Sequence, residues 1–373
     1  MTAWSGVTWD HPRGYQALRA ATRHPDAPVC DIDWDIQPLE GFESAPIATT
    51  AQRYDLIVLD HPHIGEALES GALQPLDQLF SAAELASWCA DSVGPSARSY
   101  EMSGHIWALP LDAATQVSVR RDPGVPLPDT WDQAVELAGE VTAAVPTSGP
   151  HLFLTLCGIA VAHGASPGAD VFLSESEVGE ALEVLRRFVP ERPARDDNPI
   201  ALLERMSGGA GPDYCPHVYG YVNYTRGPRP LRFGDAPRGR GGRRGSVLGG
   251  TGIAFSARRT PDDTVLDHVR WLMSARTQCG FLPDEQGQPG SRTAWESDAV
   301  NGDTRDFYRA TRATIDDAWI RPRHAGAVAF QTAGAEAVRA CLFDHHNIRR
   351  LAREVNESFE ISSRCAATPR NES

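Results

Sequence analysis

The chain contains no lysine, so all 35 of its Lys and Arg residues are arginine. A Schiff base to pyridoxal phosphate or to a substrate carbonyl needs a lysine amine, and so does the Walker phosphate loop. The sequence therefore excludes two large classes of enzyme.

Paired cysteines are also missing. The seven cysteines stand singly along 373 residues, and no Cys-x-x-Cys motif occurs. Isolated thiols in odd number are typical of reduced cysteines rather than of a disulfide framework or a zinc ribbon. We therefore expect no structural zinc site of the ribbon or finger kind, and we predict no cofactor. The cysteines are Cys30, Cys89, Cys157, Cys215, Cys279, Cys341 and Cys365.

Signals for export and membrane insertion are absent from the sequence as it begins here. Residues 1–12 lack the basic segment, the long apolar run and the cleavage site of a secretory signal. The most apolar stretch, residues 152–162, is too short to span a bilayer. If Met1 is the native start, the sequence predicts a cytoplasmic protein. A misassigned start leaves an extracellular or lipid-anchored protein open.

The net charge of −14 disfavours a nucleic-acid partner, because it repels a phosphate backbone. The one strongly basic stretch, RGRGGRRG at residues 238–245, is rich in glycine and is expected to be a disordered surface loop. With 41% hydrophobic and 23% charged residues, the chain is typical of a folded, water-soluble protein of two or three compact units.

The first third of the chain alternates between strand and helix patterns. Strands are predicted at residues 6–9, 30–36 and 54–60, and helices at residues 14–23 and 64–71, the second closed by a glycine. This order is typical of an open α/β sheet.

The word Asp-His-Pro occurs twice, at residues 10–12 and 60–62, each time after a strand and before a helix. In open α/β sheets ligands bind outside the carboxyl ends of the strands, where helix N-termini also favour polar groups. Both words are therefore expected to lie at the edge of a ligand site.

Later segments add further elements. Residues 105–122 are expected to form a turn and then extended chain, residues 130–145 a helix, and residues 245–275 a strand and an amphipathic helix. Residues 217–224 alternate between polar and apolar positions, as in a strand. One face of that strand would carry a row of hydrogen-bonding groups, namely His217, Tyr219, Tyr221 and Asn223.

Four of these segments, residues 54–79, 105–122, 130–138 and 245–259, carry a resemblance to a known family. In this order they resemble family 1 of the extracellular solute-binding proteins of ABC importers, which have the type 2 periplasmic-binding fold. The resemblance implies an α/β protein of two lobes that hold a small molecule in the cleft between them. It also implies an ABC permease as partner, but only if the protein is exported.

By the same analogy, lobe 1 would hold residues 1–112 and roughly 250–300. Lobe 2 would hold residues 113–249 and roughly 301–361, and residues 362–373 would form a flexible tail.

Asp60, His61 and His63 form the sharpest candidate site. On extended chain the two histidines would point the same way, beside the Asp60 carboxylate. Such a histidine can act as a general acid or base near neutral pH. In the alternative interpretation, Asp60 caps the following helix and the histidines make only structural hydrogen bonds.

Asp10, His11, Arg13 and Tyr15 form a second candidate cluster, in which Tyr15 is expected to belong to the core, and Asp112 is a further acidic group. Arg13 is suited to hold a carboxylate or phosphate with both arms of its guanidinium, while Asp10 and His11 face the cleft. Asp10 is equally well explained as the residue that ends the strand.

Other chemistries stay open at this point. His61, His63, Asp10 and Asp112 include ligand types that suit zinc or iron, but no metal-binding spacing supports such a site, and we predict none. A glycosidase-like carboxylate pair and a reactive Cys215 are weaker options.

Two hypotheses about function follow. The first is a binding protein for a polar or anionic organic ligand, without nucleic-acid or membrane partners. The second is a cofactor-independent cytoplasmic lyase, isomerase or hydrolase on the same fold. It would use His61 or His63 with Asp60 for proton transfer, and the His217, Tyr219 and Tyr221 face to stabilise an oxyanion. A ligand-responsive regulator ranks third, because no DNA-reading segment is present.

Overall fold

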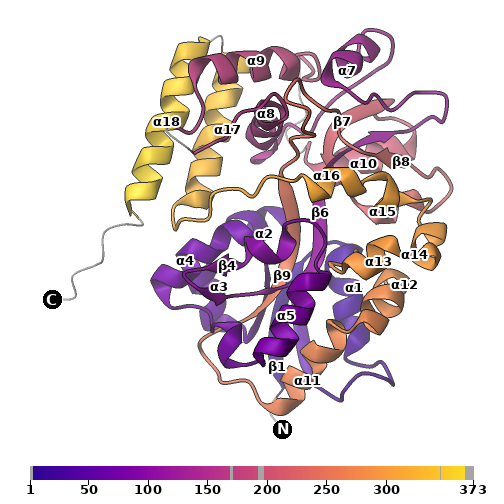
Figure 1. The fold of residues 1–373 in the computed structure, drawn as a ribbon, viewed down its shortest axis with the longest axis vertical. Helices are drawn as coiled ribbons and strands as arrows, with labels where there is room; N and C mark the ends of the chain where they lie inside the picture. The colour runs from indigo at the N-terminus through magenta and orange to yellow at the C-terminus, as the bar shows by residue number, and fades with distance from the viewer. Residues whose placement is uncertain (1–2, 169–170, 192–196, 345, 366–373) are drawn as a thin grey trace. The chain divides into compact units, whose positions relative to one another are not determined.

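The computed structural model describes residues 3–168, 171–191, 197–344 and 346–365. The chain divides into two compact units (Figure 1). It passes from one unit to the other after residues 113, 248, 302, 322 and 328. Unit 1 comprises Met1–Ala113, Gly249–Gly302 and Arg323–Val328, and unit 2 comprises Ala114–Leu248, Asp303–Pro322 and Ala329–Ser373.

Unit 1 is built on a mainly parallel sheet. Its strands β1 (Trp4–Trp9), β2 (Ile32–Gln37), β3 (Leu56–Leu59) and β9 (Leu248–Phe255) follow the order β2-β1-β3-β9. Strand β1 is parallel to both β2 and β3, whereas β9 is antiparallel to β3. All four residues of β3 are buried, as expected for a strand covered on both faces. The predicted α/β fold class is confirmed.

Helices and short elements cover the sheet of unit 1. Helix α4 ends at Ser70, and Gly71 after it has the left-handed backbone expected of a closing glycine (φ 59°). The helices are α1 (Pro12–Ala21), α2 (Leu39–Ser44), α3 (Ile47–Arg53), α4 (Ile64–Ser70), α5 (Ala82–Asp91), α6 (Ser96–Ser99), α11 (Asp263–Leu272), α12 (Leu282–Asp284), α13 (Arg292–Glu296) and α14 (Asp298–Asp303). The short elements are the helical turns η1 (His61–His63), η2 (Leu76–Gln78) and η4 (Thr277–Phe281), and the hairpin β4 (Glu101–Met102) and β5 (His105–Ile106).

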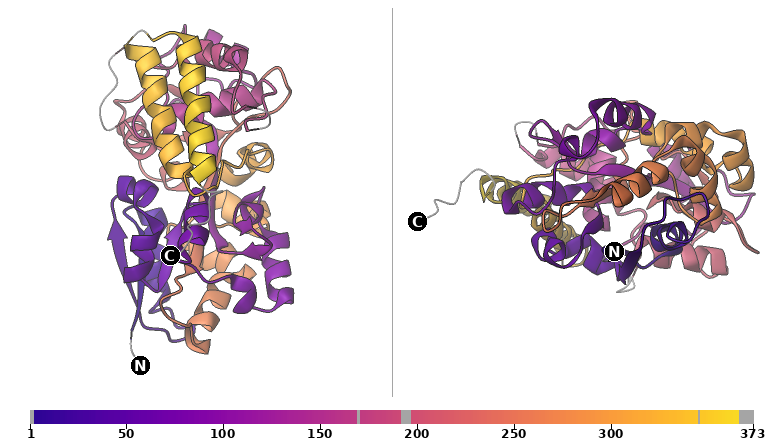
Figure 2. Two further views of the ribbon diagram at one scale, coloured as in Figure 1. Left: turned by 90° about the vertical axis from the view of Figure 1, so that its left-hand side faces the viewer. Right: turned by 90° about the horizontal axis from the view of Figure 1, so that it is seen from below.

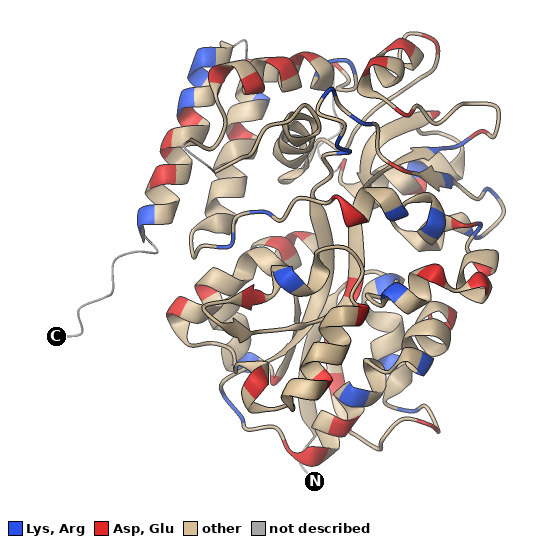
Figure 3. Cartoon of the chain, in the orientation of Figure 1, with Lys and Arg blue, Asp and Glu red and all other residues tan. Residues whose placement is uncertain are grey.

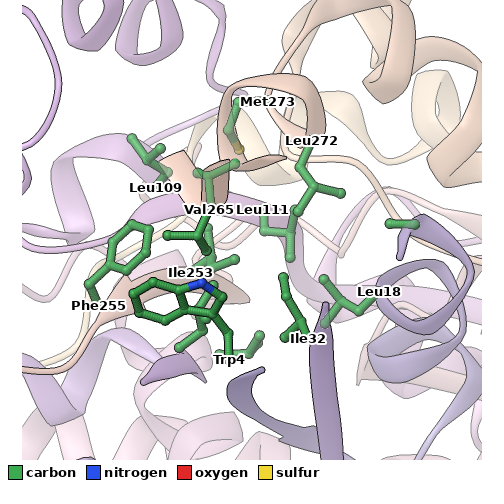
Figure 4. Packing of buried hydrophobic residues seen from close by; sticks show 14 of the residues in the cluster. Trp4, Leu18, Ile32, Leu109, Leu111, Ile253, Phe255, Val265, Leu272 and Met273 are labelled. Carbon is green, nitrogen blue, oxygen red and sulfur yellow. The ribbon is translucent and has the colours of Figure 1, made fainter. Parts of the chain in front are cut away.

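Apolar residues pack on both faces of this sheet. One face carries Trp4, Ile32 and Phe255, which meet α1 and α11 through Leu18 and Val265 (Figure 4). The other face packs against α3 and α4. The core of unit 1 therefore combines an early chain segment with residues that follow position 249.

Unit 2 is built around β6 (Leu109–Arg120), whose first five residues belong to unit 1. Within unit 2, β6 pairs antiparallel with β7 (Tyr214–Tyr219) and with β8 (Arg232–Gly234). The strand predicted to run through Asn223 ends at Tyr219. After Tyr221 the chain turns into the helical turn η3 (Val222–Thr225), so the predicted single row of four polar side chains is not formed.

Every residue of helix α8 in unit 2 is buried, and α8 packs against α9. Helices α17 and α18 run side by side in yellow (Figure 2). The helices are α7 (Trp131–Leu137), α8 (His151–Ala162), α9 (Glu175–Leu185), α10 (Pro199–Gly208), α15 (Phe307–Ala310), α16 (Arg312–Asp316), α17 (Ala327–Phe343) and α18 (Ile348–Cys365).

Two boundaries expected from the sequence are corrected here. Helix α7 is capped by Thr130 as predicted, but it ends at Leu137 instead of continuing to residue 145, because Gly139 interrupts it and Val141 and Thr142 follow. The predicted flexible tail was to begin at residue 362, but residues 362–365 continue α18. Residues 366–373 lie outside the described residues.

The arginine- and glycine-rich loop at residues 238–245 is ordered by close packing. A Cβ atom on Gly245 would come within 2.2 Å of Ala162 N in α8, and the Gly241 amide donates to Ala162 O at 3.2 Å. Arg243 Nε lies 2.9 Å from Asp317 Oδ1. The loop that was expected to be disordered therefore packs against the carboxyl end of α8.

Charged residues of both signs alternate along α18 (Figure 3). Its ion pairs are spaced by one helical turn, for example Arg350 with Glu354 at 2.7 Å and Arg364 with Glu360 at 3.0 Å.

In the part of the chain that the structure describes, no helix combines the length and apolar character needed to cross a membrane.

Candidate functional site

The two Asp-His-Pro words lie at the same edge of the unit 1 sheet. They follow β1 and β3, which are parallel neighbours in that sheet. In both words the proline occupies the first turn of the helix that follows, where its missing N–H costs nothing. Their expected position at adjacent strand ends is confirmed.

In the first word, His11 acts as a helix cap. Its Nδ1 accepts a hydrogen bond from the Arg13 amide at 3.1 Å at the start of α1. Burial, assisted by the Arg13 charge, lowers the pKa of His11 to about 3. His11 is therefore neutral near pH 7, whereas Asp10 is exposed and its amide donates to Gln37 O at 2.8 Å.

In the second word, Asp60 is the cap. Its Oδ1 accepts from the His61 amide at 2.8 Å and lies 3.1 Å from His61 Nδ1. Residues 61–63 form a 3₁₀ turn instead of extended chain, so His61 and His63 do not point the same way as the sequence suggested. The proline and the Asp60 cap start this turn.

Both histidines of this turn are buried, with His61 fully inaccessible and His63 3% exposed. The His61 ring meets Tyr100 edge to face, with ring centroids 6.4 Å apart. The Tyr100 hydroxyl in turn donates to Leu59 O, at the end of β3, at 3.2 Å. Tyr100 is thus a member of this cluster that sequence reasoning missed, because it lies 39 residues after His61 with no motif around it.

Arg13 was expected to hold a ligand's carboxylate or phosphate with both arms of its guanidinium, but the carboxylate that it holds belongs to the protein. Arg13 Nε lies 2.7 Å from Asp112 Oδ2, and its Nη2 lies 2.5 Å from Oδ1. Both side chains are almost fully buried. Burial raises the pKa of Asp112, and the Arg13 charge opposes that effect. The fixed charge of Arg13 is matched within unit 1.

In unit 2, His217 lies inside the core. Its ring packs edge to face on Trp131 at 5.5 Å and also lies against α8, where a Cβ on Gly158 would come within 2.4 Å of His217 Cε1. Burial lowers the pKa of His217 to about 3, so it is a neutral packing group. Cys215, two residues earlier, is fully buried, and burial raises the pKa of its thiol.

Tyr219, by contrast, is only partly buried. Its ring packs on that of His151, the first residue of α8, with centroids 6.0 Å apart. Burial, with smaller effects from Arg321 and Arg339, lowers the pKa of His151 to about 3. His151 was not selected from the sequence, although Gly-Pro before a long apolar run marks the start of its helix.

The last two predicted polar residues of unit 2 lie beyond β7. Tyr221 is 6% exposed and packs edge to face on Tyr224 at 6.3 Å, while Asn223 is half-buried within η3. The structure therefore groups the candidates into two sets. Asp10, His11, Arg13, Asp60, His61, His63 and Asp112 belong to unit 1, and His217, Tyr219, Tyr221 and Asn223 belong to unit 2.

Metal chemistry gains no support from the arrangement. Among the described residues, no group of three or more His, Cys, Asp or Glu side chains is placed to hold a metal ion.

A surface pocket of about 420 Å³ lies beside β2 and α3 in unit 1, lined in part by Asp35, Thr49 and Arg53. None of the candidate residues lines it, and its Asp35 carboxylate accepts from Tyr54 at 2.6 Å.

The comparisons with known proteins agree with this fold. Residues 20–178 match the model of the family described as bacterial extracellular solute-binding protein. The search of the curated proteins found no match. The resemblance stated from the sequence is confirmed.

Solved structures extend the likeness over nearly the whole chain. The maltose-bound MalE3 of T. maritima superposes with a TM-score of 0.80 at 15% identity, covering 96% of this chain and 99% of that one. The GacH receptor of Streptomyces glaucescens, solved unliganded and with acarbose, gives 0.79 at 16% identity, covering 98% and 99%. A solute-binding protein of Agrobacterium radiobacter K84 in complex with ribitol gives 0.77 at 18% identity, covering 98% of each chain. At these identities the match shows the fold, which is that of the two-lobed periplasmic-binding proteins.

Proposed function

Because this chain has the fold of the extracellular solute-binding proteins and matches their family model over residues 20–178, we propose that it binds a neutral polyhydroxyl solute, a sugar or a polyol. Neighbours of this fold were solved with maltose, acarbose and ribitol. These three ligands all carry many hydroxyl groups.

The Arg13–Asp112 ion pair is the observation that favours a neutral ligand over an anionic one. An anion is best held by a guanidinium that offers both arms, but Arg13 directs Nε and Nη2 at Asp112. The remaining candidates of unit 1 are carboxylates, which accept hydrogen bonds from hydroxyl groups, and imidazoles, of which that of His11 is neutral. Negative charges at this edge would instead repel an anionic ligand.

Isothermal calorimetry tests the proposal with maltose, ribitol and mannitol as neutral probes, and glucuronate and inorganic phosphate as anionic ones. We expect binding of at least one neutral probe and no comparable binding of the anions. Tighter binding of an anionic probe would contradict the proposal. Tyr219→Ala should weaken binding of the neutral probe, whereas Tyr54→Ala, beside the separate surface pocket, should leave it unchanged.

A second candidate function rests on the His61–Asp60 contact. An imidazole 3.1 Å from a carboxylate is the arrangement that orients a histidine for proton transfer. The enzyme hypothesis therefore predicts that the bound probe is altered on long incubation, and that His61→Ala abolishes the change. Unaltered ligand recovered by NMR, with binding intact, would favour a pure binding protein.

The place where the protein works is a separate prediction. The matching family is described as extracellular, and a cytoplasmic location is the alternative that an experiment has to test. Fractionation of cells that express the native gene, with immunodetection of the chain, decides between a cytoplasmic and an exported protein.

A further inference from the structure

Strands β6 and β7 place Gln116 beside Tyr219. The two residues are directly paired in the antiparallel register, so their side chains lie on the same face of the strands. That face is covered by α8. Tyr219 meets His151 at the start of this helix, and Gln116 Nε2 donates to Thr155 Oγ1, one turn further along, at 3.3 Å.

Both partners of this hydrogen bond are buried. Gln116 is 2% exposed and Thr155 is fully inaccessible. Because Thr155 accepts from the amide nitrogen, the orientation of the Gln116 amide is set and its carbonyl oxygen is directed elsewhere. That oxygen, Oε1, has no hydrogen-bond partner among the residues that the structure describes. Buried amide oxygens are nearly always paired, either with protein, with ordered water or with a ligand.

A fixed acceptor next to Tyr219 suits one kind of ligand group. An amide oxygen accepts a hydrogen bond from a hydroxyl group. It repels a carboxylate or phosphate oxygen, because the amide oxygen carries a partial negative charge and the anionic oxygen a full one. This preference agrees with the neutral solute argued from Arg13, yet it comes from the other unit and from different contacts.

Resting on the proposed function, we propose that Gln116 is a specificity-determining residue of the solute site. Its Oε1 accepts a hydrogen bond from a hydroxyl group of the solute, directly or through one water. Thr155 is its positioning residue, because the Thr155 hydroxyl holds the amide in the required orientation. The residue thereby selects hydroxyl-bearing ligands over anions.

Four variants test this assignment by calorimetry, with maltose and ribitol as the probes. Gln116→Met removes the acceptor at similar volume, Thr155→Val removes the positioning hydroxyl without a cavity, and Thr155→Ser keeps it. Thr311→Val is the matched control, because Thr311 is equally buried in unit 2 and its hydroxyl donates to Phe307 O at 2.8 Å. Thermal unfolding of every variant is measured alongside.

We expect Gln116→Met and Thr155→Val to weaken binding about tenfold, which corresponds to about 1.4 kcal/mol. Thr155→Ser should stay within about twofold of wild type. Thr155→Val and Thr311→Val should lower Tm to a similar extent, while only the former changes affinity. Unchanged affinity in Gln116→Met, with a lowered Tm, would overturn the assignment and leave Gln116 a packing residue.

A crystal structure of the ligand-free protein tests this inference separately from the proposed function, because it shows what surrounds Gln116 Oε1. If wild type binds neither probe, the proposed solute class fails, but the surroundings of Oε1 still decide the inference. An ordered water on Oε1 would support an acceptor open to a hydroxyl group. An Oε1 atom that accepts from a protein donor would overturn the inference even if a probe binds elsewhere.

Discussion

At the scale of single residues, the two Asp-His-Pro words have different local roles. His11 caps α1 with its imidazole, whereas Asp60 caps η1 with its carboxylate. The sequence predicted that both words follow a strand and precede a helix, because strand and helix patterns depend on local spacing. It did not predict that Arg13 would pair with Asp112, because the two residues are 99 positions apart and only the tertiary fold brings them together.

The buried Arg13–Asp112 pair leads to a prediction about stability. Asp112→Ala leaves the guanidinium buried without its carboxylate, and breaking such a pair costs about 3 to 5 kcal/mol. Replacing both partners, as in Arg13→Met with Asp112→Leu, removes both buried charges and should recover most of that loss. Urea unfolding followed by circular dichroism measures the effect. A double variant no more stable than Asp112→Ala would contradict this account.

At the scale of elements, the residues that cap or close a helix were reliable local signals. The Thr130 cap and the closing Gly71 of α4 are both found where the sequence placed them. Alternation at residues 217–223 misled the strand prediction. Gly220 makes the last contact with β6, donating to Thr115 O at 3.1 Å, and the Thr225 hydroxyl then closes η3 by donating to Val222 O.

Two helical glycines should respond in opposite ways to alanine. A Cβ on Gly158 of α8 would lie 2.4 Å from His217 Cε1 and 2.7 Å from Gly245 O, so Gly158→Ala should destabilise unit 2 by about 1 to 3 kcal/mol or more. Gly179 of α9 has its nearest neighbour, Ile348 Cγ2, at 3.7 Å. Gly179→Ala should therefore stabilise the protein by about 0.5 to 1 kcal/mol. Thermal unfolding of both variants checks the opposite signs, and a loss of stability in Gly179→Ala would be inconsistent with the packing described.

The capping box of α5 should make stability depend on pH. Glu84 accepts from the Ser81 amide at 2.8 Å and from Arg270 Nε at 2.6 Å, and the bonds from Ser81 and Arg270 lower the pKa of Glu84 to about 2. A carboxyl group whose folded pKa lies below its unfolded value stabilises the protein above about pH 4.5 and ceases to do so as pH falls toward 2.

Glu84→Gln removes the ionic partner of Arg270 and should therefore cost about 0.5 to 1 kcal/mol at pH 7, and the difference from wild type should shrink steadily below pH 4.5. Denaturant unfolding at a series of pH values measures it. The exposed Glu69 of α4 gives a control, since Glu69→Gln should show no such trend. A cost for Glu84→Gln that is the same at pH 3 and pH 7 would rule out the carboxylate cap as its origin.

At the scale of the whole molecule, the order of segments along the chain predicted the fold although no motif alone was decisive. The resemblance was stated from four segments, and a family model over residues 20–178 and solved structures at 15 to 18% identity bear it out. The candidate site was less accessible to prediction. A polar side chain can bind a ligand only if it is accessible, and neighbours far along the chain determine this. His217 is fully buried as a packing group, whereas Tyr219 on the same strand is partly exposed.

The repeated crossings of the chain predict that residues 1–113 cannot fold alone. Strand β3 needs β9 as its antiparallel partner, from Leu56 opposite Phe255 to Leu59 opposite Gly252. The larger core cluster of unit 1 also takes Val265, Val269 and Leu272 from α11. Without them a wide apolar face of the sheet is exposed to water, and the lost burial outweighs the few kcal/mol by which a domain is stable.

A fragment of residues 1–113 should show no cooperative thermal transition by circular dichroism. The same fragment joined through a flexible linker to residues 249–302 should regain one, and cooperative unfolding of the short fragment alone would show that the later segment is not part of its folding unit.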